Sequence, residues 1–130
     1  ERGSGIDKVV QEVENYQLPA PIFEVSPNAT RVVLFAYKEL KKMDRADRVR
    51  ACYQHACLRY VSSEYLTNAS LRVRFGVKEQ NKAMVSRYIR EAIDADLIAP
   101  FDSKAGRSQM KYVPFWAKPA IDYRAMKDHI

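Results

Sequence analysis

The chain has 130 residues, of which 47% are hydrophobic, and a formal net charge of +6. This composition is ordinary for a packed globular protein and argues against a disordered chain. The longest apolar run, from Val32 to Tyr37, is far too short to span a bilayer, and we find no charged-then-apolar leader, so we expect a cytoplasmic segment with no membrane anchor.

The first predicted element is a helix near the start of the chain. Ser4-Gly5-Ile6-Asp7 is typical of a capped helix start. Apolar residues at helical spacing extend this helix to about Tyr16, and Pro19 and Pro21 end it.

A β-hairpin is predicted next. Strands are expected over residues 22–26 and 31–37, because β-branched and aromatic residues there flank the turn-forming pair Pro27-Asn28. One helix and one hairpin are too small to hold a core alone. Because the chain also opens at Glu1 without a methionine, we expect a segment of a longer protein in which residues 1–43 end an upstream domain.

A long helix is predicted after residue 43. Asp44 can cap it. Cys52 and Cys57 point in different directions at about 100° per residue, which disfavours a disulfide and fits a reducing cytoplasm. Three ligands spread around one helix make a poor zinc site, so we expect no metal here, buried thiols, and His55 at the surface or at the core boundary. The predicted apolar stripe comprises Val49, Cys52, Tyr53, Ala56, Tyr60 and Val61.

Two further helices and a second hairpin complete the pattern. Thr67 or Asn68 can cap a short helix ending at Phe75, and Gly76 supplies a turn. A third helix is expected over residues 80–95, followed by strands at 99–101 and 110–116 around a polar loop. This order is that of a winged helix-turn-helix, here residues 44–117. The tail of residues 118–130 is either a short helix or a frayed end.

The positive charge is concentrated in this middle block. Residues 1–42 carry six basic and six acidic side chains, residues 43–117 carry thirteen and eight, and residues 118–130 carry three and two. A local excess of this size favours a polyanionic partner.

The third helix separates into two faces on a helical wheel. The apolar face holds Val85, Tyr88, Ile89, Ala92 and Ile93, and the polar face holds Lys82, Ala83, Ser86, Arg87 and Arg90. Such a helix fits the major groove of DNA, where side chains of these types bond base edges and phosphates. The candidate DNA-binding residues are Gln80, Asn81, Lys82, Ser86, Arg87 and Arg90.

The helix's leading residues, Asn81, Lys82 and Ser86, are the expected base readers. The alternative is an ordinary solvated face, and it is favoured by the acids Glu91 and Asp94 near the exposed side and by Glu79 at the start of the helix. Three features favour DNA: the short preceding helix with its glycine turn, the basic hairpin that follows, and the local charge excess.

The hairpin loop offers a second contact region. Lys104, Arg107 and Lys111 suit a wing that lies along the phosphate backbone or enters the minor groove, although a solubilising hairpin tip would also carry such charges. The aromatic residues Tyr112, Phe115 and Trp116 are expected in the core or at a seam, in preference to stacking platforms for single-stranded nucleic acid.

Two stretches resemble a known family. The segment ERGSGIDKVVQEVENYQLPAPIFEV is similar to the end of the divergent ATPase-like module in bacterial predicted transcriptional regulators, which are related to the C-terminal part of RecG-type DNA helicases and to divergent AAA proteins. The segments TNASLRVRFGVKEQNKAMVSRYIREAIDADLIAPFD and MKYVPFWA resemble the winged helix that closes such proteins. The resemblance covers nearly the whole chain to about Ala117.

This resemblance implies a DNA-associated regulator whose full-length chain carries upstream ATPase-like and Schlafen-type AlbA-like domains. Gly3-Ser4-Gly5 is similar to the last glycine box of GHKL-type ATP sites. The Asn-bearing and metal-binding elements of such sites are absent from this sequence, so we expect no cofactor here.

The sequence therefore predicts an α+β fold, a winged helix-turn-helix preceded by a helix and β-hairpin remnant of a GHKL-like module. We expect it to bind double-stranded DNA in transcriptional control. No nucleophile–base pair is evident, so no enzyme activity is expected. A protein-interaction module, including a homodimer that does not touch DNA, is the alternative.

Overall fold

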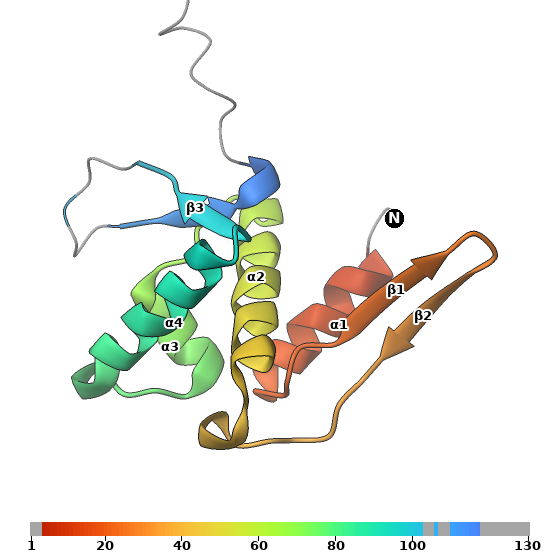
Figure 1. The fold of residues 1–130 in the computed structure, drawn as a ribbon, viewed down its shortest axis with the longest axis horizontal. Coiled ribbons are helices and arrows are strands. Elements are labelled where there is room, and N and C mark those ends of the chain that lie inside the picture. The colour runs from red at the N-terminus through yellow and green to blue at the C-terminus, as the bar shows by residue number, and fades with distance from the viewer. Residues whose placement is uncertain (1–3, 103–105, 107–109, 118–130) are drawn as a thin grey trace, which may run out of the picture.

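The computed structural model of the chain describes residues 4–102, 106 and 110–117. Within them the fold is mixed α+β, as predicted, with four α-helices and two small antiparallel sheets (Figure 1). In chain order the elements are α1 Ser4–Asn15, β1 Ile22–Ser26, β2 Ala29–Val33, η1 Leu40–Lys42, α2 Arg45–Val61, α3 Asn68–Phe75, η2 Glu79–Asn81, α4 Lys82–Asp94, β3 Ile98–Pro100, β4 Tyr112–Pro114 and η4 Phe115–Ala117. None of the described helices is long and apolar enough to cross a bilayer.

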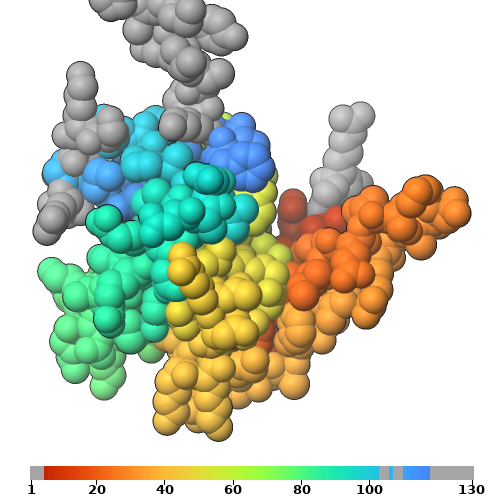
Figure 2. Space-filling model, in the orientation of Figure 1, coloured from red at the N-terminus to blue at the C-terminus, as the bar shows by residue number. Residues whose placement is uncertain are grey.

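Helix α2 stands at the centre of the molecule. Helix α1 and the β1–β2 hairpin lie on one side of it, and α3 and α4 lie on the other (Figures 1 and 2). Ala20, in the loop after α1, belongs to the same buried cluster as Ala51 and Cys52 of α2. The segment before residue 44 therefore shares its core with the helices that follow.

The first hairpin confirms the strand at residues 22–26 and its turn, but the prediction that the second strand reaches Tyr37 is wrong. Strand β2 ends at Val33, which pairs with Ile22. The next pair along the ladder would oppose Leu34 to Pro21, and proline has no backbone N–H to offer. The residues after Val33 therefore leave the sheet.

Helix α2 begins where the sequence predicts. The Asp44 side chain accepts from the backbone of Asp47 at 2.8 Å, and Asp47 reciprocates in a capping box. The predicted stripe is confirmed at Cys52 and Ala56, both fully buried, but it is wrong at Val61, which is 59% exposed. Near this end of the helix, Tyr60 packs edge-on against the half-exposed Trp116 instead of entering the core.

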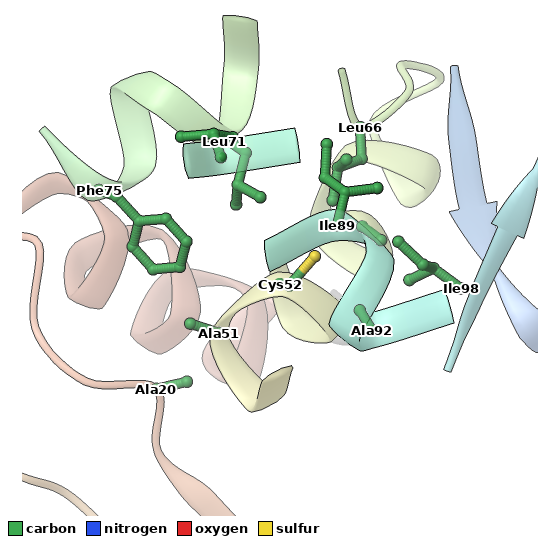
Figure 3. Packing of buried hydrophobic residues seen from close by; sticks show 11 residues of the cluster. Ala20, Ala51, Cys52, Leu66, Leu71, Phe75, Ile89, Ala92 and Ile98 are labelled. Atoms are coloured by element: carbon green, nitrogen blue, oxygen red, sulfur yellow. The ribbon is translucent and has the colours of Figure 1, made fainter. Parts of the chain in front are cut away.

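The core forms where α2, α3, α4 and β3 meet (Figure 3). Leu66, Leu71 and Val85 are fully buried, and Ile89 is 3% exposed. Burying one such side chain contributes about 1.5–3 kcal/mol. Ala51 on α2 is fully buried as well, and its small side chain leaves room for the neighbouring elements to approach.

Helices α3 and α4 are joined by a tight connection. Thr67, not Asn68, caps α3, because its side chain accepts from the Ser70 N–H at 3.0 Å in a second capping box. Gly76 ends α3 with φ 67°, a left-handed conformation that suits glycine. The predicted helix from residue 80 is two elements, the single turn η2 and then α4.

The second sheet is shorter than predicted. Strands β3 and β4 pair antiparallel, with Ile98 opposite Pro114. Residues 115 and 116 were expected to continue the strand, but this is wrong because they belong to η4, Phe115–Ala117, which begins directly after Pro114. Leu66 and Tyr112 also exchange backbone hydrogen bonds of 3.1 and 2.8 Å, which anchors the hairpin to the segment that leads into α3.

Candidate nucleic-acid interface

Helix α4 buries one face and exposes the other, as its sequence predicts. Val85, Ile89 and Ala92 face the core. Helix α4 forms part of the molecular surface on the side of α2 away from the β1–β2 hairpin (Figures 1 and 2). The exposed residues of α4 include Lys82, Ala83, Ser86, Arg87 and Arg90.

Gln80 and Asn81 lie one turn before α4 proper. Both are exposed residues of η2. Asn81 occupies the N-cap position of α4 but makes no side-chain capping hydrogen bond. Its amide group, at the leading end of the helix, is therefore available to an external partner.

One acid that counted against nucleic-acid binding, Glu91, does not lie on the exposed face of α4, whereas Asp94 and Glu79 are exposed. Glu91 was expected near that face, yet its side chain is only 20% exposed and pairs with α2. Nη2 of Arg48 lies 3.0 Å from Oε2 of Glu91, and Nε of Arg45 lies 3.5 Å from the same oxygen. The turn of the helix places this carboxylate against α2, where it balances two guanidinium groups.

The positive side chains of α4, in contrast, have no acid partner among the described residues. In that part of the chain, eight Lys and Arg side chains form no ion pair, and six of them lie in α3, in α4, in the connection between these helices or directly before β4. These six, which we call the unpaired cation group, are Arg72, Lys78, Lys82, Arg87, Arg90 and Lys111. Cations whose charge is not balanced by an acid of the protein can neutralise phosphates.

Asn68 and Arg72 belong to this region although the sequence reasoning did not select them. The Asn68 amide donates to the Lys82 carbonyl and to Ser86 Oγ, both at 3.0 Å, and accepts from Arg72 Nε at 2.9 Å. Asn68 thus braces the start of α4 against α3. The spacing of four residues between Asn68 and Arg72 on one helix face is the signal that could have suggested them.

This contact also orients the hydroxyl group of Ser86. Because Ser86 Oγ accepts a hydrogen bond from Asn68, the hydroxyl proton remains to be donated elsewhere. Ser86 is exposed, so it can present a donor to an acceptor atom such as guanine O6 or a phosphate oxygen.

The β3–β4 hairpin contributes Lys111, which is exposed and whose Nζ lies 5.3 Å from the centre of the Tyr65 ring. Burial raises the pKa of Tyr112, and the positive charge of Arg90 partly offsets this rise. Lys104 and Arg107, the other predicted wing residues, lie outside the described residues.

The region of Cys52, His55 and Cys57 offers no candidate metal site. Burial and, to a smaller extent, the charge of Glu91 raise the pKa of Cys52 to about 12, and both cysteines are free thiols. His55 was predicted at the surface or boundary, and this is wrong because it is 5% exposed, covered by the carboxylate of Glu14 from α1. Among the described residues, no three His, Cys, Asp or Glu side chains lie together as a metal site would require.

Comparisons with known proteins identify no relative: neither a family model, nor a curated protein, nor a solved structure matches this chain.

Proposed function

We propose that residues 44–117 form a winged helix-turn-helix that binds double-stranded DNA. Helices α3 and α4 would be the helix-turn-helix, with Gly76 and η2 as the turn, and the β3–β4 hairpin would be the wing. The observation that carries the proposal is the unpaired cation group defined above, together with the ion pair that holds Glu91 against Arg48 of α2. Six of the eight described cations without acid partners lie in α3, in α4, in the connection between these helices or directly before β4.

In this proposal α4 enters the major groove. Asn81, Lys82 and Ser86 at its leading end read base edges, while Arg87 and Arg90 bond phosphates or guanines. Arg72, held at its Nε by Asn68, contacts the backbone from α3. The wing, with Lys111 at its base, lies along the phosphates.

The family resemblance of the sequence suggests the kind of full-length protein to which this DNA-binding segment belongs. Residues 1–43 would be the end of a GHKL-like ATPase module, and the chain would belong to a bacterial transcriptional regulator of the divergent AAA type. We propose a binding role for this segment and no catalytic one.

Charge-removing variants test the DNA proposal. Arg87→Ala and Arg90→Ala should each weaken binding of a labelled duplex, since each removes a phosphate or base contact. Arg31→Ala is the matched control, because Arg31 is 73% exposed on β2, on the other side of α2. Equal affinities for all three variants and the parent would refute the proposal.

A second candidate function is self-association, which one observation favours. Phe115 and Trp116 are 51% and 50% exposed. Their rings pack on Tyr53 and Tyr60 of α2, at centroid distances of 6.0 and 5.4 Å. An exposed aromatic cluster of this kind is common at protein interfaces. Sedimentation of the parent protein and of Trp116→Ala separates the two functions. Self-association is favoured if the parent is a dimer that binds no duplex at low salt and Trp116→Ala is a monomer.

A further inference from the structure

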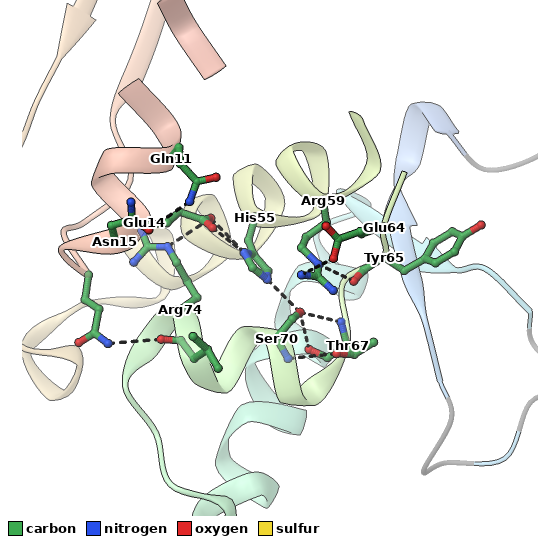
Figure 4. Close-up of polar contacts among 12 residues, drawn as sticks. Gln11, Glu14, Asn15, His55, Arg59, Glu64, Tyr65, Thr67, Ser70 and Arg74 are labelled. Carbon is green, nitrogen blue, oxygen red and sulfur yellow. Dashed lines mark hydrogen bonds and ion pairs between the residues drawn. The ribbon is translucent and has the colours of Figure 1, made fainter. Parts of the chain in front are cut away.

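The end of α1 is joined to α2 and α3 through buried polar groups. Glu14 accepts from Nδ1 of His55 at 2.8 Å and lies 3.4 Å from Nε of Arg74 (Figure 4). The three side chains are at most 10% exposed. Burial lowers the pKa of Arg74, and the charge of Glu14 opposes this effect. Glu14 is therefore the counter-charge of a buried guanidinium group, which is costly to leave unpaired.

A second set of contacts joins the residues after α1 to the end of α3. Arg74 Nη2 donates to the Leu18 carbonyl at 2.6 Å, and Gln17 Nε2 donates to the Val73 carbonyl at 3.3 Å. Gln17 also covers Gly76, since a Cβ there would lie 2.8 Å from Oε1 of Gln17. Gln17 has a left-handed φ of 55°. This conformation is strained for a residue other than glycine and persists only where surrounding contacts hold it.

Polar contacts and the first turn of α3 together link Glu14 to α4. His55 Nε2 lies 2.9 Å from Ser70 Oγ, and Ser70 is half of the capping box that begins α3. Asn68, the first residue of that helix, donates to Ser86 on α4. Helix α3 has only eight residues, too few to be stable alone. Its position therefore depends on its neighbours, through the buried Leu71 and Phe75 and through these polar contacts at both ends.

We propose that the docking of α1 on α3 controls the DNA affinity of α4. This inference rests on the proposed DNA-binding function. The binding-competent protein is the one in which α1 is docked, and anything that releases α1 lowers affinity because α3 no longer braces the start of α4. Coupling between two sites commonly changes affinity about 5- to 150-fold.

Glu14→Gln tests the inference, with Glu12→Gln as the matched control from the exposed side of the same helix. We expect Glu14→Gln to speed amide hydrogen exchange in α1 and α3 and to weaken duplex binding about fivefold or more, and Glu12→Gln to do neither. Faster exchange in α1 with parental DNA affinity would overturn the inference. Unchanged exchange in α1 would overturn it too, because Glu14 would then not hold the helix.

Gln17→Gly keeps the test decisive if Glu14→Gln fails to fold. Glycine accepts the φ of residue 17 without strain and removes the amide that contacts Val73 and covers Gly76. We expect a folded protein with weaker duplex binding, whereas parental affinity would contradict the coupling. If the parent protein binds no duplex, the proposed function fails. Amide hydrogen exchange in α4 then tests whether α1 is coupled to α4. Faster exchange of the α4 amides in the variants supports the coupling, and unchanged exchange refutes it.

Discussion

Arg48 of α2 holds Glu91 of α4 with two hydrogen bonds, from Nε to Oε1 at 3.2 Å and from Nη2 to Oε2 at 3.0 Å. The same guanidinium donates to the Met43 carbonyl at 2.8 Å, and it lies 4.9 Å from the centre of the Tyr88 ring. This bidentate pair therefore fixes the orientation of α4 on α2. It also withdraws a negative charge from the face of α4 that we propose binds DNA.

Removing this carboxylate should destabilise the fold. We expect Glu91→Ala to lower the free energy of unfolding by about 2 kcal/mol, as is usual for hydrogen bonds to charged groups, measured by urea denaturation. Asp94→Ala is the control, since it removes an equal charge from an exposed position of the same helix and should change stability by less than about 0.5 kcal/mol. Equal effects would show that the pair with Arg48 contributes nothing.

Two glycines should respond oppositely to alanine. Gly76 has φ 67°, and a Cβ there would meet the Gln17 amide, so Gly76→Ala should cost about 1–2 kcal/mol or more. Gly5 lies in α1, where an added Cβ would meet nothing within 4 Å, so Gly5→Ala should stabilise by up to about 1 kcal/mol. Thermal unfolding of both variants checks this, and a Gly76→Ala protein as stable as the parent would contradict the left-handed turn at this residue.

Several elements were predictable because their causes are local. Asp44 caps the start of α2 by accepting from the backbone N–H of Asp47, three residues later. Gly76 ends α3 through its own backbone conformation. The buried side of α4 follows from the spacing of Val85, Ile89 and Ala92. Each signal lies within one or two helical turns of the structure that it specifies.

Three wrong or missed assignments involve partners that are distant in sequence. His55 is buried because Glu14, 41 residues away, supplies a carboxylate. Glu91 leaves the exposed face because Arg48, 43 residues away, attracts it. The role of Asn68 was missed for the same reason, since its partner Ser86 lies on another helix. Helical periodicity assigns a residue to a face but does not identify what covers that face.

Alkaline pH should destabilise the protein through Cys52. Burial raises its pKa from an ordinary 9.0 to about 12, so between these values the unfolded chain releases a proton that the folded chain retains. Stability is therefore fully present below about pH 9 and falls by roughly 1.4 kcal/mol per pH unit above it. Urea unfolding at several alkaline pH values should show a shallower loss for Cys52→Ala, and identical slopes would contradict the burial effect.

The Asn68 brace should be visible as coupling between two residues. We expect Asn68→Ala and Ser86→Ala each to weaken duplex binding, and the double variant to lose less than the two single losses combined, because both remove the same hydrogen bond. Ala69 offers no such side-chain contact, so Ala69→Ser is a neighbouring control with parental affinity. Strict additivity in this cycle would show that the two residues act independently.

The salt dependence of duplex binding tests the central claim most directly. If the unpaired cation group neutralises phosphates, the logarithm of the binding constant should fall linearly with the logarithm of salt concentration, by about 0.9 for each phosphate contact. Arg87→Ala should reduce this slope by about 1, and Arg31→Ala should leave it unchanged. No binding at low salt, or a slope that Arg87→Ala leaves as steep as in the parent protein, would contradict DNA binding through the unpaired cation group.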